Sequence, residues 1–288
     1  MKIMKPKVIA IAGPTASGKT KMAIELAKQI DGEVISADSR LVYKGFDIAA
    51  AKPTVEEREG IPHHLIDIVE PEYDYSVADY HDDAKKAIYD ILSRDKTPIV
   101  AGGTGLYFRV LLENYDLPRV EANPKLRAEL DSREKGDLLA ELKNLDRISY
   151  EKLIDANKRR IVRALEVTKI LNRPFSEVST QKEPEFEVEW KMPKINSREE
   201  LYERINQRVD KMVEDGLIEE TKKLLEKHGR IKNFVCTIGY QEVLTYLDGE
   251  ATLEEALDKL KQHSRNYAKR QLTWFRKNPK LRNACLGV

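Results

Sequence analysis

Residues 8–20 decide the fold of this chain, and they read Val8-Ile9-Ala10-Ile11-Ala12-Gly13-Pro14-Thr15-Ala16-Ser17-Gly18-Lys19-Thr20. The first five form a short, continuous apolar run, which is typical of a buried parallel strand. The last eight fit the pattern G-x-x-x-x-G-K-[ST], in which glycines let backbone N–H groups wrap around a phosphate at the start of a helix. We therefore interpret residues 13–20 as a loop that binds a diphosphate or nucleotide. An ordinary glycine-rich turn is the alternative.

Two side chains of this loop carry specific chemistry. Lys19 supplies a mobile positive charge to a phosphate, and the hydroxyl of Thr20 suits a Mg²⁺ ion. The pattern does not identify the phosphate compound, because a pyrophosphate is enough to fill such a loop.

The sequence beyond the loop alternates between helical and strand patterns. Apolar residues recur at helical spacing over 22–30, and a second helix is expected to begin at the capping box Ser76-x-x-Asp79. Residues 33–36 and 98–101 read as further buried strands. This order predicts an α/β fold with a doubly wound parallel sheet.

The pattern changes after about residue 114. Between 124 and 171 the apolar residues recur at helical spacing, which predicts a helical insertion. Residues 186–190 alternate and read as a return strand, and capping boxes at Ser197 and Thr252 predict two further long helices. We expect three segments: the first part of a P-loop α/β core at 1–113, a helical insertion domain at 114–185, and a return to the core with C-terminal helices at 186–288.

Composition excludes several classes of protein. The 288 residues are 41% hydrophobic and 34% charged, which is enough for a core and unlike a disordered or collagen-like chain. The two cysteines form neither a metal-binding spacing nor a disulfide framework. The sequence contains no apolar run of 18 residues, and the N-terminus lacks the pattern of a signal peptide. A cytoplasmic protein that does not bind a membrane is therefore expected.

Charge is unevenly distributed although the net charge is only +1. Residues 259–282 contain nine Lys or Arg and no Asp or Glu. The rest of the chain therefore contains 41 basic and 49 acidic residues. Such an asymmetry indicates either a surface for a polyanion or a solvated helix face.

Asp38 ends the second predicted strand, at the sheet edge where open α/β sheets bind ligands. Its position leaves three roles open: a general base, a magnesium ligand or a cap of the turn. His63 and His64 are adjacent and have no carboxylate or cysteine at a ligand spacing, so we expect them to position a loop rather than to bind a metal.

Motifs along nearly the whole chain carry a resemblance to a known family. They are the loop 13–20, Asp38-Ser39, Val42-Tyr43, Asp47-Ile48, Ala51-Lys52-Pro53, Pro62 to Asp67, Tyr75 to Asp79, Gly102 to Tyr107, Arg159-Arg160, Arg163 to Val167, Ile238-Gly239-Tyr240 and Ala268 to Trp274. In this order they are similar to the bacterial tRNA dimethylallyltransferases, also called tRNA isopentenyltransferases (the IPP transferase family).

The resemblance implies an enzyme that transfers a dimethylallyl group from dimethylallyl diphosphate to N6 of the adenosine 3′ of the tRNA anticodon. It implies that the loop 13–20 holds the diphosphate, with Mg²⁺ on Thr20. The implied catalytic residues are Asp38 as the general base, with Thr15 and Arg208 on the diphosphate. A carboxylate near the adenine suits this reaction because an aromatic amine is a poor nucleophile that must lose a proton.

The resemblance also implies a set of residues that face the tRNA anticodon stem-loop, and the insertion domain at 114–185 is expected to face it too. The set is Asp38, Ser39, Arg40, Leu41, Thr104, Arg127, Arg159, Arg160, Arg163, Ile238, Gly239 and Tyr240. Arg159 and Arg163 align on a helix while Arg160 lies about 100° away, so one face is expected to pack or pair internally. Tyr240 is interpreted either as a ring that stacks on a base or as a half-buried core residue. The protein is expected to act as a monomer.

Two departures from the family pattern concern the predicted site. Leu41 stands where the family usually has Gln, and Ala49-Ala50 stand where it has Gly-Thr. Two other functions remain as alternatives. The first is a P-loop nucleotide or metabolite kinase, and the second is a non-catalytic RNA-binding protein that uses the loop only as an anion site.

Overall fold

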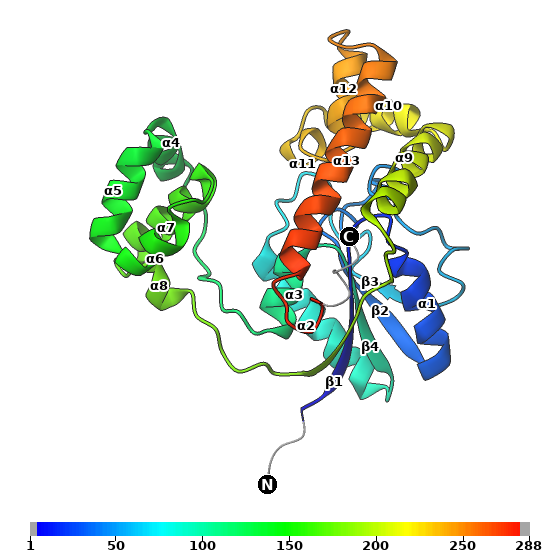
Figure 1. Cartoon of the computed structure of the whole chain (residues 1–288), viewed down its shortest axis with the longest axis horizontal. Coiled ribbons are helices and arrows are strands. Elements are labelled where there is room, and N and C mark those ends of the chain that lie inside the picture. The colour runs from blue at the N-terminus through cyan, green and yellow to red at the C-terminus, as the bar shows by residue number, and fades with distance from the viewer. Residues whose placement is uncertain (1–4, 283–288) are drawn as a thin grey trace. The chain divides into compact units, whose positions relative to one another are not determined.

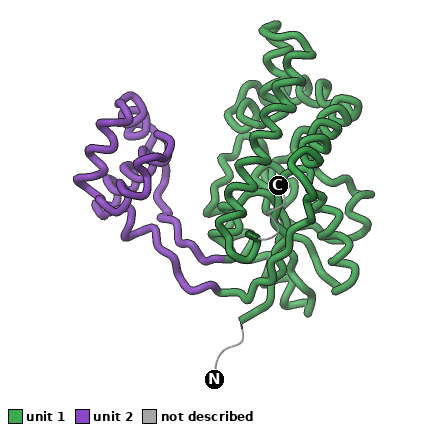
Figure 2. The backbone as a smooth tube through the Cα atoms, viewed as in Figure 1, with its two compact units in different colours: residues 1–112, 185–288 green, residues 113–184 purple. Residues whose placement is uncertain are grey.

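The computed structural model describes residues 5–282. The chain forms two compact units, which Figure 2 colours separately. The larger unit contains the residues up to Leu112 together with those from Glu185 onward, and the smaller unit is Glu113–Pro184. Each junction lies one residue before the boundary expected from the sequence.

The larger unit is built on a parallel sheet of five strands (Figure 1). The strands are β1 (Lys7–Ala12), β2 (Gly32–Ala37), β3 (His63–His64), β4 (Thr97–Gly102) and β5 (Glu187–Lys191). Their order across the sheet is β3-β2-β4-β1-β5, and all neighbouring pairs are parallel. The predicted α/β class with a parallel sheet is confirmed, and β3 is an additional strand at one edge.

Helices cover both faces of the sheet, as Figure 1 shows. α1 (Lys19–Ile30) lies on one side, with Ala23 and Ala27 packed against Ile9 and Val34 of the strands. α2 (Val77–Ser93) and α3 (Gly105–Leu112) lie on the other side. α2 begins at the predicted capping box, in which Ser76 and Asp79 each bind the other's backbone N–H.

A helical layer follows β5 in the larger unit. It consists of α9 (Arg198–Glu214), α10 (Leu217–His228), α11 (Lys232–Val235), α12 (Tyr240–Leu247) and α13 (Leu253–Phe275). The two long helices begin after Ser197 and Thr252, as predicted. This layer shares an apolar core with the segment after β2, in which Phe46 packs among Phe234, Tyr240 and Leu244. The core holds that segment against the helices.

The smaller unit is helical, as the periodicity predicts. Its helices are α4 (Pro124–Ser132), α5 (Lys135–Leu145), α6 (Arg147–Leu153), α7 (Lys158–Leu171) and α8 (Phe175–Val178). Leu130, Leu138, Leu142 and Leu165 form its core. Within residues 5–282, none of the helices of either unit has the length and apolar character needed to cross a bilayer.

Candidate functional site

The loop between β1 and α1 has the backbone of a phosphate cradle. Gly18 lies at the N-cap of α1 with φ of 89°, a conformation that favours glycine, and Ala16 also has a positive φ of 59°. The Nζ of Lys19 donates a hydrogen bond of 2.6 Å to the carbonyl of Pro14, so the side chain folds back over the loop. The positive end of the α1 dipole faces the same space.

A cavity of about 540 Å³ lies beside this loop. It opens past the carboxyl ends of β2 and β4, where parallel sheets bind ligands. The residues that line it include Thr15, Lys19 and Thr20 from the loop; Asp38, Ser39, Arg40 and Leu41 after β2; Arg208 from α9; and His263, Tyr267, Arg270 and Gln271 from α13. The structure therefore brings the phosphate loop and the predicted base to one cavity.

Two cations converge beside Thr15. The Nη1 of Arg208 donates to the hydroxyl of Thr15 at 3.2 Å, and its Nη2 donates to the carbonyl of Ala51 at 3.4 Å. Burial lowers the pKa of Lys19 to about 8, an effect that Asp38 opposes and Arg208 reinforces. Burial also lowers the pKa of Arg208, against the opposing charges of Asp38 and Glu57. An arginine remains charged nonetheless, so the site holds positive charge that an anion would stabilise.

Asp38 directly follows β2 and is partly exposed in the cavity. Its Oδ1 accepts a hydrogen bond of 2.8 Å from the backbone N–H of Arg40, which closes the turn after the strand. The next residue, Ser39, donates its backbone N–H to the hydroxyl of Thr104 at 3.2 Å. Asp38 therefore does cap the turn, and its position in the cavity remains compatible with proton or metal binding.

Gln271 of α13 is a site residue that the sequence analysis did not single out. Its Oε1 accepts the backbone N–H of Thr15 at 2.9 Å, and its Nε2 donates to the carbonyl of Gly103 at 2.9 Å. A Cβ on Gly103 would lie 2.1 Å from that Nε2, so only glycine admits this contact. The amide is buried and joins the phosphate loop to the loop after β4. The signal available in the sequence was the motif at 268–274, which does not reveal its distant partners.

Two polar atoms in the cavity wall have no hydrogen-bond partner among the residues that the structure describes. They are the Oγ of Ser36 and the Nε2 of His63, and both are buried. The Nδ1 of His63 lies 2.8 Å from the carbonyl of Ile61, so Nδ1 carries the proton and Nε2 is a free acceptor. Burial lowers the pKa of His63, which keeps the ring neutral. His64 lies instead against buried Glu33, and residues 5–282 contain no cluster of three His, Cys, Asp or Glu side chains suited to a metal.

The structure separates the predicted residues at 238–240. Ile238 lines the cavity. Tyr240, which was expected either to stack on a base or to be half-buried, is fully buried, and its hydroxyl donates to Glu220 at 2.6 Å. The interpretation of Tyr240 as a ring that stacks on a nucleotide is therefore wrong, because the ring is part of the core. Gly239 has φ of 107°, and a Cβ there would lie 2.7 Å from the Cβ of Ala49, so it also faces the protein interior.

The predicted arginines of the smaller unit divide into two kinds. Arg127 binds the carboxylate of Glu166 through two hydrogen bonds of 2.8 and 3.0 Å, and Arg163 binds it at 2.7 Å. Glu166 is fully buried, so these two arginines neutralise an interior charge. Arg159 and Arg160 are exposed on α7. Arg163 therefore pairs internally, whereas Arg159, which was expected to share its face, is as exposed as Arg160.

The basic residues of α13 are also not equivalent. Lys261 forms an ion pair with Asp210 of α9 at 2.6 Å, and Arg265 donates to Asn206 at 2.6 Å. Lys269 and Arg270 are exposed, and the guanidinium of Arg270 lies 5.7 Å from the ring centre of Tyr267. Of these four side chains, Lys269 and Arg270 leave their positive charge exposed, and Arg270 also lines the cavity.

The donor set fits a magnesium ion that arrives with a diphosphate. Thr20 places an exposed hydroxyl at the start of α1, and Asp38 lines the same cavity. Mg²⁺ prefers oxygen ligands, keeps several waters and needs only one or two protein groups when phosphate oxygens complete its shell.

Comparison with known proteins agrees with the resemblance seen in the motifs. Residues 41–278 match the family model described as IPP transferase. A tRNA dimethylallyltransferase of Anoxybacillus flavithermus is 46% identical over 276 residues, which cover 95% of this chain and 88% of that protein.

Two solved structures are similar over nearly all of this chain. The tRNA isopentenylpyrophosphate transferase of Bacillus halodurans gives a TM-score of 0.71 at 44% identity, with 96% of this chain and 88% of that chain covered. A eukaryotic dimethylallyltransferase acting on tRNA gives a TM-score of 0.81 at 32% identity, with 98% and 72% covered. Because the family match spans most of the sequence and these relatives extend it over nearly the whole length, the chain belongs to the IPP transferase family.

Proposed function

We propose that the protein transfers the dimethylallyl group of dimethylallyl diphosphate to N6 of the adenosine 3′ of the anticodon in tRNA. The observation that carries the proposal is the single cavity in which the phosphate loop, Arg208 and Asp38 meet. A kinase of the same fold also needs a phosphate loop. The relatives that are similar to this chain over almost its whole length are named tRNA dimethylallyltransferases, which favours prenyl transfer.

The diphosphate would bind to the loop 13–20. Its oxygens would meet the N–H groups at the start of α1, the Nζ of Lys19 and the guanidinium of Arg208, with Thr15 between the loop and Arg208. Mg²⁺ held at Thr20 would neutralise part of the diphosphate charge. These groups stabilise the negative charge that the diphosphate gains as it leaves.

The transfer itself is a substitution at C1 of the prenyl group. The nitrogen N6 forms a bond to C1, the bond from C1 to the diphosphate oxygen breaks, and its electron pair leaves with the diphosphate. The proton that N6 loses would pass to a carboxylate oxygen of Asp38. The adenine must leave its stack to reach the cavity, as in other enzymes that modify bases.

Residues around the cavity mouth would contact the nucleotides next to the adenosine. We propose this role for Ser39, Arg40, Leu41 and Thr104, with Ile238 as an apolar contact. In the smaller unit, Arg159 and Arg160 are proposed phosphate contacts, and Arg127 and Arg163 can contribute donors not engaged by Glu166. Lys269 and Arg270 of α13 join the proposed set.

One assay tests the proposal against its alternatives. The protein is incubated with unmodified tRNA, Mg²⁺ and either dimethylallyl diphosphate labelled in the prenyl group or ATP labelled in the γ-phosphate. Label transferred from the prenyl donor to tRNA supports the proposal, and a tRNA with guanosine in place of the target adenosine is the control. Phosphate transfer from ATP alone would instead show a kinase, and tRNA binding without any turnover would show a binding protein.

A further inference from the structure

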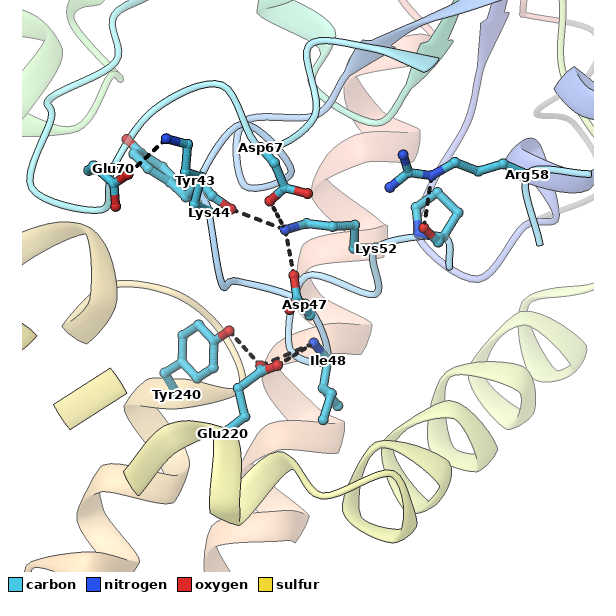
Figure 3. Close-up of polar contacts among 11 residues, drawn as sticks. Tyr43, Lys44, Asp47, Ile48, Lys52, Arg58, Asp67, Glu70, Glu220 and Tyr240 are labelled. Atoms are coloured by element: carbon cyan, nitrogen blue, oxygen red, sulfur yellow. Dashed lines mark hydrogen bonds and ion pairs between the residues drawn. The ribbon is translucent and has the colours of Figure 1, made fainter. Parts of the chain in front are cut away.

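A short turn forms one wall of the cavity. Residues 47–52, here called the Asp47–Lys52 turn, are closed by backbone hydrogen bonds from Ala51 to Ile48 and from Lys52 to Asp47, both 2.9 Å. The side chain of Lys52 is only 5% exposed, and its Nζ binds Asp47 at 2.5 Å, the carbonyl of Tyr43 at 3.2 Å and Asp67 (Figure 3). The alanines of the turn line the cavity. The shape of the Asp47–Lys52 turn is therefore fixed from within by the buried Lys52.

Glu220 of α10 holds the turn from outside. Its Oε2 accepts the backbone N–H of Ile48 at 2.9 Å, and its Oε1 accepts the N–H of Ala49 at 3.3 Å and the hydroxyl of Tyr240 at 2.6 Å. Figure 3 shows the carboxylate between Tyr240 and the turn. Hydrogen bonds to an ionised acceptor are stronger than bonds between neutral groups. One carboxylate thus joins α10, α12 and the Asp47–Lys52 turn.

Tyr240 is a fixed support for that carboxylate. Its ring packs edge-on against Phe46 with centroids 5.0 Å apart, inside the core of the helical layer. Burial and the adjacent Glu220 raise the pKa of its hydroxyl, so it stays protonated and donates.

The far end of the turn contacts the phosphate site. The carbonyl of Ala51 accepts the Nη2 of Arg208 at 3.4 Å, and the Nη1 of the same guanidinium donates to Thr15. Ala51 has φ of 50°, an uncommon value for a residue with a Cβ, so the carbonyl direction depends on the turn being held. A continuous series of contacts therefore runs from Tyr240 through Glu220 and the turn to Arg208.

We propose that Glu220 is a positioning residue for Arg208, and that Tyr240 fixes the Glu220 carboxylate for this purpose. This inference rests on the proposed function in one respect, namely that Arg208 binds the diphosphate. Without the charge of Glu220, the turn loses its outer anchor and the Ala51 carbonyl no longer fixes one edge of the guanidinium. Arg208 would then lose part of its alignment before the diphosphate arrives, although it keeps its charge.

The test measures the affinity for inorganic pyrophosphate with Mg²⁺ by calorimetry in the full chain. Glu220→Gln should weaken that affinity about tenfold, since small misplacements of a clamp are costly, and Tyr240→Phe should weaken it less. Glu219→Gln is the matched control, because it removes the same charge from the neighbouring position of α10 and should change nothing. In steady-state prenyl transfer, Glu220→Gln should lower kcat or raise KM for dimethylallyl diphosphate, while KM for tRNA stays within about twofold of wild type.

A double-mutant cycle separates positioning from a general loss of structure. In an Arg208→Ala background, Glu220→Gln should cause no further loss of pyrophosphate affinity. An equal loss in both backgrounds, or a parallel rise in KM for tRNA, would overturn the proposal. If Glu220→Gln does not fold, Tyr240→Phe is taken through the same cycle. A wild-type protein that binds pyrophosphate but transfers no prenyl group would refute the proposed function, whereas the cycle on pyrophosphate would still decide the role of Glu220.

Discussion

The side chain of Gln271 accepts a hydrogen bond of 2.9 Å from the backbone N–H of Thr15, although 256 positions separate the two residues. The last helix among the described residues, α13, thereby fixes the loop that follows β1. Because the other end of the amide binds Gly103, three segments meet at one buried group.

Gln271→Ala should therefore destabilise the protein. The substitution leaves the N–H of Thr15 and the carbonyl of Gly103 without their partner, and we expect the free energy of unfolding to fall by about 1–3 kcal/mol. Denaturant unfolding measures it. Gln262→Ala, at an exposed position of the same helix, should leave the unfolding midpoint unchanged. Equal midpoints for Gln271→Ala and wild type would show that the amide contributes no stability.

Asp38→Asn should preserve the binding of both substrates and slow their reaction. Loss of a positioned base is expected to reduce kcat by roughly 10²–10⁴. Single-turnover prenyl transfer with saturating tRNA measures the effect. Near-normal turnover would assign the base to another group. If the variant instead binds Mg²⁺ more weakly but turns over normally at saturating Mg²⁺, Asp38 is a magnesium ligand.

Lys19 should make pyrophosphate binding depend on pH. Since burial lowers its pKa to about 8, the free protein loses this charge above that pH, and the affinity should then decrease by up to about tenfold per pH unit. Lys19→Arg, which stays charged, is the control and corrects for the titration of pyrophosphate itself. Calorimetric titrations between pH 7 and pH 9 measure both proteins. Parallel pH profiles would contradict the assignment.

Lys19 should also make the stability of the free protein depend on pH, and this stability should rise with pH whereas the affinity for pyrophosphate falls. An unfolded lysine keeps its proton up to its ordinary pKa of 10.5, whereas folded Lys19 releases it near 8. The cost of burying the charge is therefore fully present below pH 8 and decreases as the pH rises toward 10.5. Lys19→Met should unfold at a higher temperature than wild type at pH 7 in the absence of ligand. The difference should shrink at pH 9 and above.

Leu41→Gln tests the main departure from the family pattern. Leu41 lines the cavity, and the next residues, Val42 and Tyr43, are buried in the apolar core. Because Leu41 directly precedes residues that pack into this apolar core, we expect the glutamine to raise kcat/KM for tRNA by no more than about tenfold, or about 1.4 kcal/mol. Steady-state kinetics with one cognate and one non-cognate tRNA measure it. A much larger gain confined to the cognate tRNA would show that this chain lacks a base-recognition bond.

Neutralising Lys269 and Arg270 to Gln should weaken tRNA binding and reduce its dependence on salt. Each phosphate contact contributes nearly one unit to the slope of log K against log salt, so the slope should fall by about one to two. Affinity for pyrophosphate should not change. The double variant Lys222→Gln/Lys223→Gln, on exposed positions of α10, removes the same charge elsewhere. Equal salt slopes for the two double variants would make the end of α13 an ordinary solvated face.

The sequence predicted those parts of the fold that depend on local pattern. β1 and β4 are buried and mostly apolar, and β2 carries the apolar pair Val34-Ile35 between the buried polar residues Glu33 and Ser36, so short apolar runs indicated all three. β3 was missed because two histidines pairing at the sheet edge leave no periodicity to detect. β5 alternates Glu with Val and Trp because it is an edge strand that is only partly buried, and it was found on that alternation.

The contents of the cavity were less accessible to prediction. Residues near the loop and after β2 follow from local motifs, since strand ends of a parallel sheet share one edge. Gln271 and Glu220 bind atoms of the backbone more than a hundred positions away, and no spacing in the sequence indicates such partners. The role of Tyr240 was left open between base stacking and core packing, because that choice depends on the helices around it, and the structure shows core packing.

The position of β5 in the chain has a consequence for folding during synthesis on the ribosome. β1, which carries the phosphate loop, pairs on one side with β4 and on the other with β5, and β5 lies after the whole helical insertion in the chain. A ribosome must therefore complete the insertion before β1 gains its second neighbour. Until then the apolar strand has one open edge, which is the kind of surface on which chains aggregate. The length of this interval is set by the synthesis of the insertion, which lies between β4 and β5 in the chain. A pause in translation before residue 187 would prolong it.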